Sequence, residues 1–336
     1  MKAYIERITY YLPEKVEENL NERLRVKTGI EYRHVAGENE TSSDMAVKAA
    51  EKLLADVSKE NIDYVLFCSQ SPDYYLPTTA CIIQDRLGLS KNCGALDYNH
   101  GCTGYIYGLG LAKGLIESGQ AQNILLLTAE TYSKYINPED HAVLPLFGDA
   151  ATATLVVGKE SDSQGLYGFK YGTDGSGYNN LIVPVGGARH PYQTTEIENF
   201  ADRYDNKRTN RNLFMDGGAI MDFALDVVPP SLNEILSANN LDRTDIDYYV
   251  FHQANSFMLK SLQKICKLKK LPYWNDVQEY GNTVSNSIPI ALADMMQENS
   301  PDKLRRILLM GFGVGLSWGG CIVDLSLTKI QPYKQF

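Results

Sequence analysis

Apolar runs and helix-spaced apolar positions alternate along the chain. Residues 63–68 and 123–128 are almost continuously apolar, which predicts central strands covered on both faces. Residues 44–57 carry apolar side chains at helical spacing, which predicts an amphipathic helix. Residues 105–118 are small or apolar on every face, which predicts a buried helix. This alternation is typical of the α/β fold class.

The second half of the chain repeats this style. Its predicted elements are apolar strands at 246–251, 305–311 and 321–327 and a helix at 257–266. A further helix over 223–236 is expected to be interrupted by Pro229-Pro230. The strand and loop at 63–70 resemble those at 246–253, which indicates an internal duplication.

The polar, glycine-flanked segment 158–165 is where the two halves would meet. We therefore expect a first half at residues 1–162 and a second half at 163–336. Residues 189–211 form a polar insertion, which is most simply a surface loop. Whether this insertion acts as a lid stays open at this point.

Composition narrows the class of protein. The chain has 336 residues, of which 44% are hydrophobic and 22% charged, as in folded globular proteins. Its 32 Lys and Arg side chains against 41 Asp and Glu give a net charge of −9, which disfavours general nucleic-acid or anionic-membrane binding. No apolar run approaches the roughly 18–20 residues that cross a bilayer, and the first residues lack the apolar core of a signal peptide. We expect a cytoplasmic protein with neither nucleic acid nor a membrane as its partner.

The six cysteines show no metal-site spacing. They are Cys68, Cys81, Cys93, Cys102, Cys266 and Cys321. No two form a CxxC pair and none stands with His at zinc-ligand spacing, so we predict no metal site. Most are expected to be buried thiols that pack as small hydrophobic groups.

Cys102 is the candidate nucleophile. Gly101 and Gly104 flank it and permit a sharp turn from a strand into a helix expected from Thr103. The unpaired N–H groups and the dipole at that helix start would lower the pKa of the thiol, and the same amides could bind an oxyanion. The alternative is a buried cysteine in a packing turn, and this segment alone leaves both open.

His252 directly follows an apolar strand, at the sheet edge where α/β proteins place their sites. A lone histidine is more often structural. The remaining histidines compete for the same role, His100 most of all because it lies two residues before Cys102. The others are His34, His141 and His190.

Asn282 lies in a Gly-Asn-Thr turn that precedes a predicted helix. Its amide could donate a hydrogen bond to a carbonyl oxygen without adding charge. The alternative is a turn whose helix is capped by Thr283 or Ser285. Residues 311–320 are rich in glycine but lack nucleotide-loop spacing, so we predict a tight turn between two strands.

Cys102, His252 and Asn282, in this order and with their neighbours, resemble the β-ketoacyl-[acyl-carrier-protein] synthase III family of the thiolase superfamily. The likeness runs along nearly the whole chain, through Tyr11-Leu-Pro-Glu-Lys, Thr28-Gly-Ile-Glu-Tyr-Arg-His34, Leu76-Pro-Thr-Thr-Ala-Cys-Ile-Ile-Gln84, Phe147-Gly-Asp149, His252-Gln-Ala-Asn255, Gly281-Asn-Thr283 and Gly311-Phe-Gly313. It implies a thiolase-like five-layered αβαβα sandwich of two pseudo-repeated halves, and a homodimer.

The resemblance also implies a reaction. Acyl-coenzyme A acylates Cys102, and malonyl-acyl-carrier protein then condenses with the acyl group as carbon dioxide leaves. His252 and Asn282 bind the malonyl thioester carbonyl, and the backbone amides of Cys102 and Val314 form the oxyanion hole. Such an enzyme starts fatty acid biosynthesis or builds a specialised acyl chain. It needs no metal or redox cofactor, since coenzyme A thioesters are its substrates.

Departures from the family bear on substrate choice. Arg23 stands nearest the tryptophan that stacks on the adenine of coenzyme A, and His141 replaces the arginine on its other side. Phe257 and Asp222 replace basic residues that dock the carrier. Leu76 replaces a Phe that closes the acyl pocket across the dimer. The implied substrate-binding residues are Leu76, Phe147, Gly217, Asn255, Arg23 and His141, and the carrier-docking candidates are Lys260 and Lys264.

Two alternatives remain beside the condensing enzyme. In one, His252 is a general base and the acyl group passes to an alcohol or amine in polysaccharide or secondary-metabolite biosynthesis. In the other, the chain is a non-catalytic partner subunit. The acyl chain length, the acceptor and the pathway are left open by the sequence.

Overall fold

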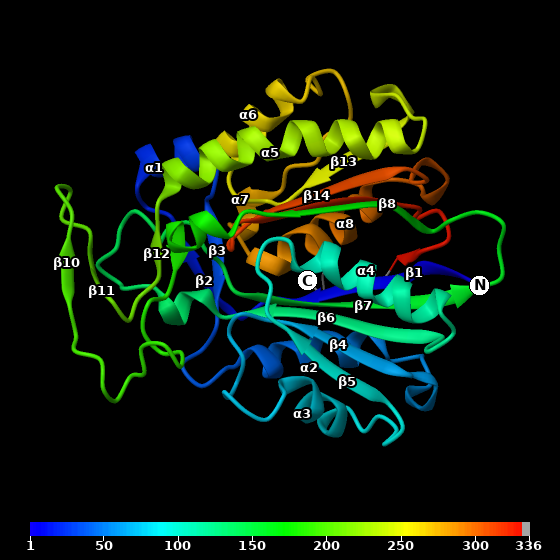
Figure 1. The fold of residues 1–336 in the computed structure, drawn as a ribbon, viewed down its shortest axis with the longest axis horizontal. Helices are drawn as coiled ribbons and strands as arrows, with labels where there is room; N and C mark the ends of the chain where they lie inside the picture. Colours follow the sequence, from blue (N-terminus) through cyan, green and yellow to red (C-terminus); the bar gives the residue numbers. More distant parts are fainter. Residues whose placement is uncertain (331–336) are drawn as a thin grey trace.

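Two stacked sheets organise the molecule (Figure 1). The computed structural model describes residues 1–330, so the last six residues of the predicted second half lie outside it. Within that part, the larger sheet has six strands and the smaller has four. The larger sheet runs β16 (Lys329–Ile330), β1 (Lys2–Tyr11), β7 (Ala150–Lys159), β6 (Asn123–Glu130), β4 (Tyr64–Cys68) and β5 (Gly94–Tyr98). The smaller runs β13 (Tyr248–Phe251), β14 (Ile307–Gly313), β15 (Ser317–Val323) and β8 (Leu166–Thr173).

Helices form the other three layers (Figure 1). The central pair, α4 (Gly104–Glu117) and α8 (Ser287–Glu298), lies between the sheets and contributes to one apolar cluster with both of them. The outer pairs are α2 (Ser42–Leu53) with α3 (Thr79–Arg86) against the larger sheet and α5 (Gly217–Ala238) with α6 (Ser256–Ile265) against the smaller. The predicted five-layered αβαβα sandwich is confirmed.

The two sheets repeat one arrangement. Strands β1, β7, β6, β4 and β5 lie side by side with two antiparallel pairings followed by two parallel ones. Strands β8, β15, β14 and β13 follow the same order and directions, and Tyr273 continues it by a parallel bridge to Tyr249. This equivalence explains the similarity between residues 63–70 and 246–253.

Shorter elements connect these layers. They are β2 (Lys15–Glu18), α1 (Glu22–Thr28), β3 (Tyr32–Val35), β9 (Leu181–Ile182), β12 (Phe214–Met215) and α7 (Val277–Tyr280), with 3-10 turns at Lys59–Asn61, Tyr132–Tyr135, Gly175–Asn180, Arg243–Asp245, Val284–Asn286 and Pro301–Lys303. Throughout residues 1–330, each helix is too short or too polar to cross a membrane.

Two local predictions are wrong, and a third is confirmed with narrower bounds. Helix α5 is continuous through Pro229 and Pro230, because its buried face packs against the smaller sheet and offsets the lost backbone hydrogen bonds. The polar insertion is not only a loop, since β10 (Asn199–Ala201) and β11 (Lys207–Thr209) pair within it as an exposed hairpin (Figure 1). The predicted tight turn between two strands is confirmed in the glycine-rich segment, but it spans only residues 314–316, because most of the glycines belong to β14 and β15.

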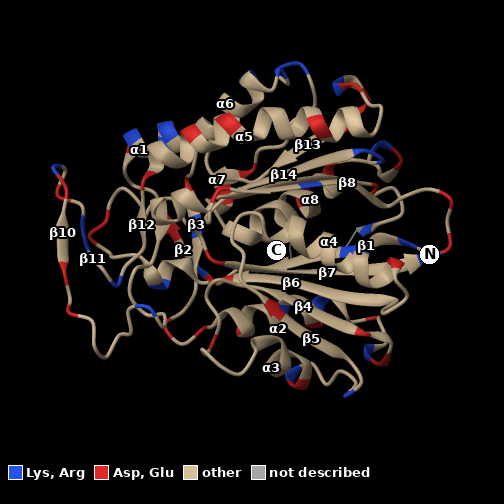
Figure 2. Ribbon diagram, in the orientation of Figure 1, with Lys and Arg blue, Asp and Glu red and all other residues tan. Residues whose placement is uncertain are grey.

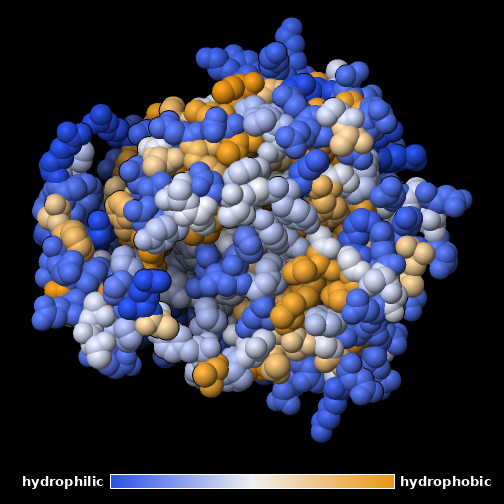
Figure 3. Space-filling view, in the orientation of Figure 1, coloured by the Kyte–Doolittle hydropathy of each residue, from blue (hydrophilic) through white to orange (hydrophobic). Residues whose placement is uncertain are grey.

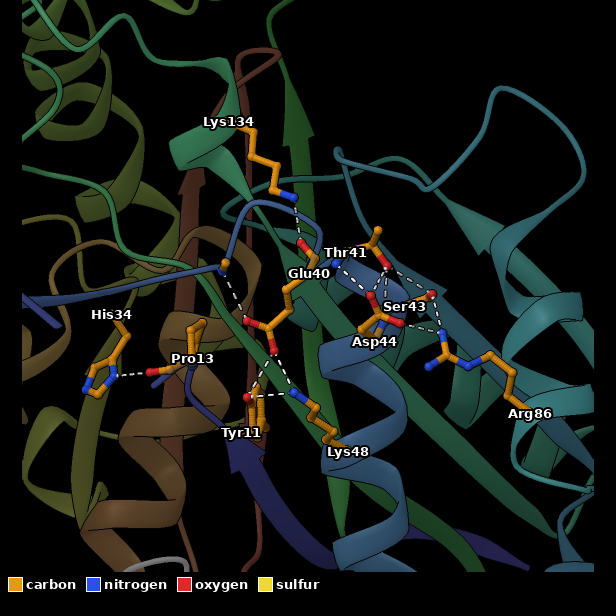
Figure 4. A network of polar contacts seen from close by, with 11 residues as sticks. Tyr11, Pro13, His34, Glu40, Thr41, Ser43, Asp44, Lys48, Arg86 and Lys134 are labelled. Carbon is orange, nitrogen blue, oxygen red and sulfur yellow. Dashed lines mark hydrogen bonds and ion pairs between the residues drawn. The ribbon is translucent and has the colours of Figure 1, made fainter. Parts of the chain in front are cut away.

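A polar network fixes the start of α2 (Figure 4). Thr41 and Asp44 form a reciprocal capping box, and Arg86 pairs with Asp44 at 2.9 Å. Glu40 accepts hydrogen bonds from Tyr11 (2.9 Å) and Lys48 (2.7 Å). These contacts tie α2 to β1 and α3, on the outer layer of the larger sheet.

Candidate active site

Cys102, His252 and Asn282 line one cavity of about 500 Å³. Cys102 lies between β5 and α4, His252 directly follows β13, and Asn282 lies between α7 and α8. All three side chains are buried. The fold therefore brings together the three candidates that the sequence separates by some 180 residues.

Backbone amides converge on the Cys102 thiol. Helix α4 begins at Gly104, one residue later than predicted. The N–H groups of Val314 and of Cys102 itself reach the sulfur. This approach requires glycine at 313, because a Cβ built there would lie 2.7 Å from Cys102 Sγ. Two donors that meet at one point have the arrangement of an oxyanion hole.

The prediction that the helix start lowers the pKa of Cys102 is wrong. Burial raises the pKa of the thiol to about 12, and the Val314 and Cys102 amides act only in the opposite direction. The physical reason is desolvation, which disfavours the thiolate more than two amides stabilise it. The Cys102 side chain is thus a neutral thiol.

Ser287 fixes the orientation of His252. The Ser287 hydroxyl lies 2.7 Å from His252 Nδ1 and accepts a longer bond (3.3 Å) from the N–H of Gln253. Among the described residues, Nδ1 is the acceptor that the Ser287 hydroxyl can reach, so we assign the hydroxyl as the donor to Nδ1. The proton of the neutral ring is therefore on Nε2. The ring also meets Phe312 edge-on, at 5.5 Å between centroids. His252 can therefore offer the cavity an N–H donor.

Burial lowers the pKa of His252 to about 3, so the ring is neutral in the physiological range. A neutral imidazole and a neutral amide suit a site that stabilises developing negative charge without binding an anion permanently.

Backbone pairing and a side-chain contact hold Asn282. Its N–H donates to Leu146 O (2.8 Å) and its carbonyl accepts from Gly148 N–H (3.0 Å). The side-chain Oδ1 accepts from Val284 N–H at 2.9 Å, which leaves the amide Nδ2 as the donor presented to the cavity. The alternative of a helix cap by Thr283 or Ser285 is wrong. The 3-10 turn Val284–Asn286 and helix α8 both begin without a side-chain cap hydrogen bond.

The other predicted residues fall into two groups. Phe147, Gly217 and Asn255 line the cavity. The exposed residues Arg23 and His141 do not line it, although their neighbours Leu24 and Ala142 do. Also outside the lining are Leu76, Lys260 and Lys264, all exposed.

The competing histidines lie elsewhere. His34 Nδ1 contacts Pro13 O at 2.7 Å (Figure 4). His141 and His190 are exposed. His100 is half-buried beside the turn at Cys102, where its Nδ1 contacts Thr103 Oγ1 at 2.9 Å.

Two buried residues near the site were missed. Ser287 stands in a polar stretch after Asn282, which gave no signal of a contact with His252. Glu130 ends an apolar strand, and that position was a usable signal. Its carboxyl accepts from Gln70 N–H (3.0 Å), Ser71 Oγ (3.1 Å) and Ser285 Oγ (3.0 Å). Burial nevertheless raises the pKa of Glu130 to about 8.

No group of three or more His, Cys, Asp or Glu side chains within residues 1–330 is placed to hold a metal ion. The cavity chemistry visible in these residues is a thiol, two neutral side-chain donors and two backbone amides.

Comparison with known proteins gives consistent matches. The family model described as 3-oxoacyl-[acyl-carrier-protein (ACP)] synthase III matches residues 96–175, and the model of its C-terminal part matches 236–325. The chain is 38% identical over 311 residues to the β-ketoacyl-[acyl-carrier-protein] synthase III of Clostridium perfringens, covering 92% of each. A crystal structure of a 3-oxoacyl-(acyl-carrier-protein) synthase III aligns with TM-score 0.93 and 43% identity, over 96% of this chain and 100% of that one. The 3-oxoacyl-(acyl-carrier protein) synthase of Burkholderia xenovorans LB400 aligns with TM-score 0.88 and 33% identity, over 98% and 96%.

The lowered pKa of His252 predicts an acid-sensitive fold. The unfolded chain binds a proton near the ordinary value of 6.5, whereas the folded chain does so only near 3. The free energy of unfolding therefore falls as pH drops below about 6.5, by about 2 kcal/mol at pH 5 from this residue. Because asparagine does not titrate, the free energy of unfolding of His252→Asn should fall by about 2 kcal/mol less than that of wild type between pH 7 and pH 5. Urea unfolding at the two pH values measures this difference.

The variant His190→Asn, at an exposed position, is the matched control. Its free energy of unfolding should fall between pH 7 and pH 5 by as much as that of wild type. Equal losses in wild type and His252→Asn would contradict a buried neutral ring.

Proposed function

Since this chain belongs to the 3-oxoacyl-[acyl-carrier-protein] synthase III family, we propose that it is an acyltransferase that condenses an acyl group from acyl-coenzyme A with malonyl-acyl-carrier protein. The observation that carries this proposal is the single cavity lined by Cys102, His252 and Asn282. The reaction starts fatty acid synthesis. Relatives named for this condensation favour it over acyl transfer to an alcohol or amine.

The first half-reaction acylates Cys102. The sulfur attacks the thioester carbonyl, and the Cys102 and Val314 amides bind the oxygen that becomes negative. As the tetrahedral intermediate collapses, the carbon–sulfur bond to coenzyme A breaks. Because the resting thiol is neutral, its proton leaves with the coenzyme A thiolate and no net charge stays in the cavity.

The second half-reaction uses the other two donors. Nε2–H of His252 and Nδ2–H of Asn282 hold the malonyl thioester carbonyl, so they stabilise the enolate formed as carbon dioxide leaves. The enolate carbon attacks the acyl-cysteine carbonyl, and the bond to the Cys102 sulfur breaks to release the β-ketoacyl product. The sulfur leaves as a thiolate and takes up one proton from solvent, which restores the neutral thiol. Thioester cleavage and carbon dioxide release supply the driving force, so we propose that no resident metal or redox cofactor takes part.

The carrier would dock beside the cavity mouth. Asn255, Phe257 and Met258 from the start of α6 line the cavity, and Lys260 and Lys264 are exposed further along that helix. Figure 2 shows basic residues on α1 and around the end of α6, on the same side of the molecule. This basic surface suits an acidic carrier protein.

A homodimer is proposed through the free edge of the larger sheet. Strand β5 ends the sheet within the described residues, and Leu96 on it and Leu111 on α4 are each 40% exposed. Figure 3 shows an apolar patch on the face where α4 and β5 lie. The loop with Leu76, 82% exposed, would close the acyl pocket of the partner subunit. The six free cysteines support a cytoplasmic location.

The central test is intact-protein mass spectrometry with a panel of acyl-coenzyme A thioesters. We expect one acyl adduct on wild type, none on Cys102→Ala, and discharge of the adduct with carbon dioxide release when malonyl-acyl-carrier protein is added. Discharge to an alcohol or amine without carbon dioxide would support the acyl-transfer alternative. No adduct from any acyl donor would favour a non-catalytic subunit.

Charge reversal tests the docking surface. The double variant Lys260→Glu, Lys264→Glu should raise KM for malonyl-acyl-carrier protein by roughly 10-fold and leave acylation by acyl-coenzyme A unchanged. Lys91→Glu is the control, because Lys91 is exposed in the segment between α3 and β5. Figure 1 shows these two elements on the opposite side of the molecule from α6. An unchanged KM in the double variant would place the carrier elsewhere.

Light scattering tests the dimer. We expect a mass of twice the 37.5 kDa chain at micromolar concentration. A mass of one chain would contradict the dimer and the role given to Leu76.

A further inference from the structure

The two amides at Cys102 Sγ come from opposite halves of the chain. Cys102 belongs to the turn before α4, and Val314 belongs to the turn between β14 and β15. An oxyanion hole works only if both N–H groups point at the same position to within a few tenths of an ångström. Something must therefore hold the two turns at a fixed separation.

A chain of hydrogen bonds joins these turns. His100 Nδ1 contacts Thr103 Oγ1 at 2.9 Å, and Thr103 Oγ1 contacts Ser317 Oγ at 2.9 Å. The Ser317 hydroxyl in turn donates to Val314 O at 3.0 Å. Thr103 and Ser317 are 214 residues apart in sequence, and both are almost fully buried, with 1% and 3% of their surface exposed.

The direction of every bond in this chain follows from its last member. A carbonyl oxygen only accepts, so the one proton of the Ser317 hydroxyl is used on Val314. Ser317 Oγ must then accept the proton of Thr103, and Thr103 Oγ1 must accept from Nδ1–H of His100. Protonation of His100 would add a proton at Nε2 and leave this order intact.

His100 is itself held in place. Its ring stacks on Tyr107 at 4.1 Å between centroids, and its backbone carbonyl accepts from the Cys68 thiol at 3.0 Å. Tyr107 packs in turn against Tyr171 of β8, at 4.7 Å between centroids. His100, the first donor in this series of hydrogen bonds, is therefore anchored by α4, β4 and β8.

We propose that His100, Thr103 and Ser317 are positioning residues that hold the N–H of Val314 at the correct place relative to the N–H of Cys102. This series of hydrogen bonds anchors the Val314 carbonyl. It thereby fixes the backbone orientation of Val314, whose N–H faces the Cys102 sulfur. None of the three side chains lines the cavity, so they act through Val314. This inference rests on the proposed function, because it assigns a role in forming the acyl-cysteine.

Matched substitutions at Thr103 test the proposal. Thr103→Val keeps the shape and removes the hydroxyl, whereas Thr103→Ser keeps the hydroxyl. The rate of Cys102 acylation by acetyl-coenzyme A, followed by intact mass, should fall about 10- to 100-fold in Thr103→Val and stay within about threefold of wild type in Thr103→Ser. The dissociation constant of acetyl-coenzyme A, measured in a Cys102→Ala background, should stay within about twofold, since the cavity lining is untouched.

A second pair guards against a Thr103 variant that fails to fold. His100→Asn can still donate an amide N–H toward Thr103, whereas His100→Ala cannot. We expect the alanine variant to acylate about tenfold more slowly and the asparagine variant to recover most of that loss. Equal acylation rates within both pairs, in a wild type that does acylate, would overturn this inference alone. Absence of an acyl adduct on wild type would instead overturn the proposed function.

Discussion

The close approach of the β14–β15 segment to the turn at Cys102 is the constraint on which the site depends. A Cβ on Gly311 would lie 2.9 Å from Cys102 O, and one on Gly101 would lie 2.5 Å from Val314 Cγ1. Glycine at these positions lets two backbones from opposite halves of the chain touch. The layered fold makes this contact possible, because α4 lies between the two sheets and packs against β14 and β15 of the smaller sheet.

Neutrality is the second property of the site. The Cys102 thiol is protonated, His252 is uncharged, and burial moves the Glu130 carboxyl toward its neutral form. A permanent charge would be costly in this buried cavity, whereas oriented dipoles are not. In the proposed reaction, the negative charge that develops on a thioester oxygen lies where amide and imidazole donors already point.

The sequence was most informative where chemistry and periodicity coincide. The strands at 63–68 and 123–128 follow from uninterrupted apolar runs, and the order of Cys102, His252 and Asn282 indicated the family. What local sequence cannot supply is the balance of distant contacts. Helix α5 stays continuous through its two prolines because it is buried against a sheet formed by distant segments. Burial likewise raises the pKa of the Cys102 thiol more than the amides at the turn lower it.

The same limit applies to the residues around the site. Ser287 meets His252 only because α8 packs beneath β13, and Thr103 meets Ser317 only when the two halves join. These partners carry no motif of their own. Their roles depend on hydrogen-bond directions that require three-dimensional proximity.

The most direct measurement is a crystal structure of the acyl-enzyme formed with acetyl-coenzyme A in the absence of malonyl-acyl-carrier protein. The account predicts that the acyl oxygen on Cys102 lies within about 3.2 Å of the backbone nitrogens of both Cys102 and Val314. It also predicts that this oxygen makes no hydrogen bond to His252 or Asn282. An acyl oxygen bound to His252 and Asn282, or turned toward solvent, would contradict the division of the site into two separate oxyanion-stabilising pairs.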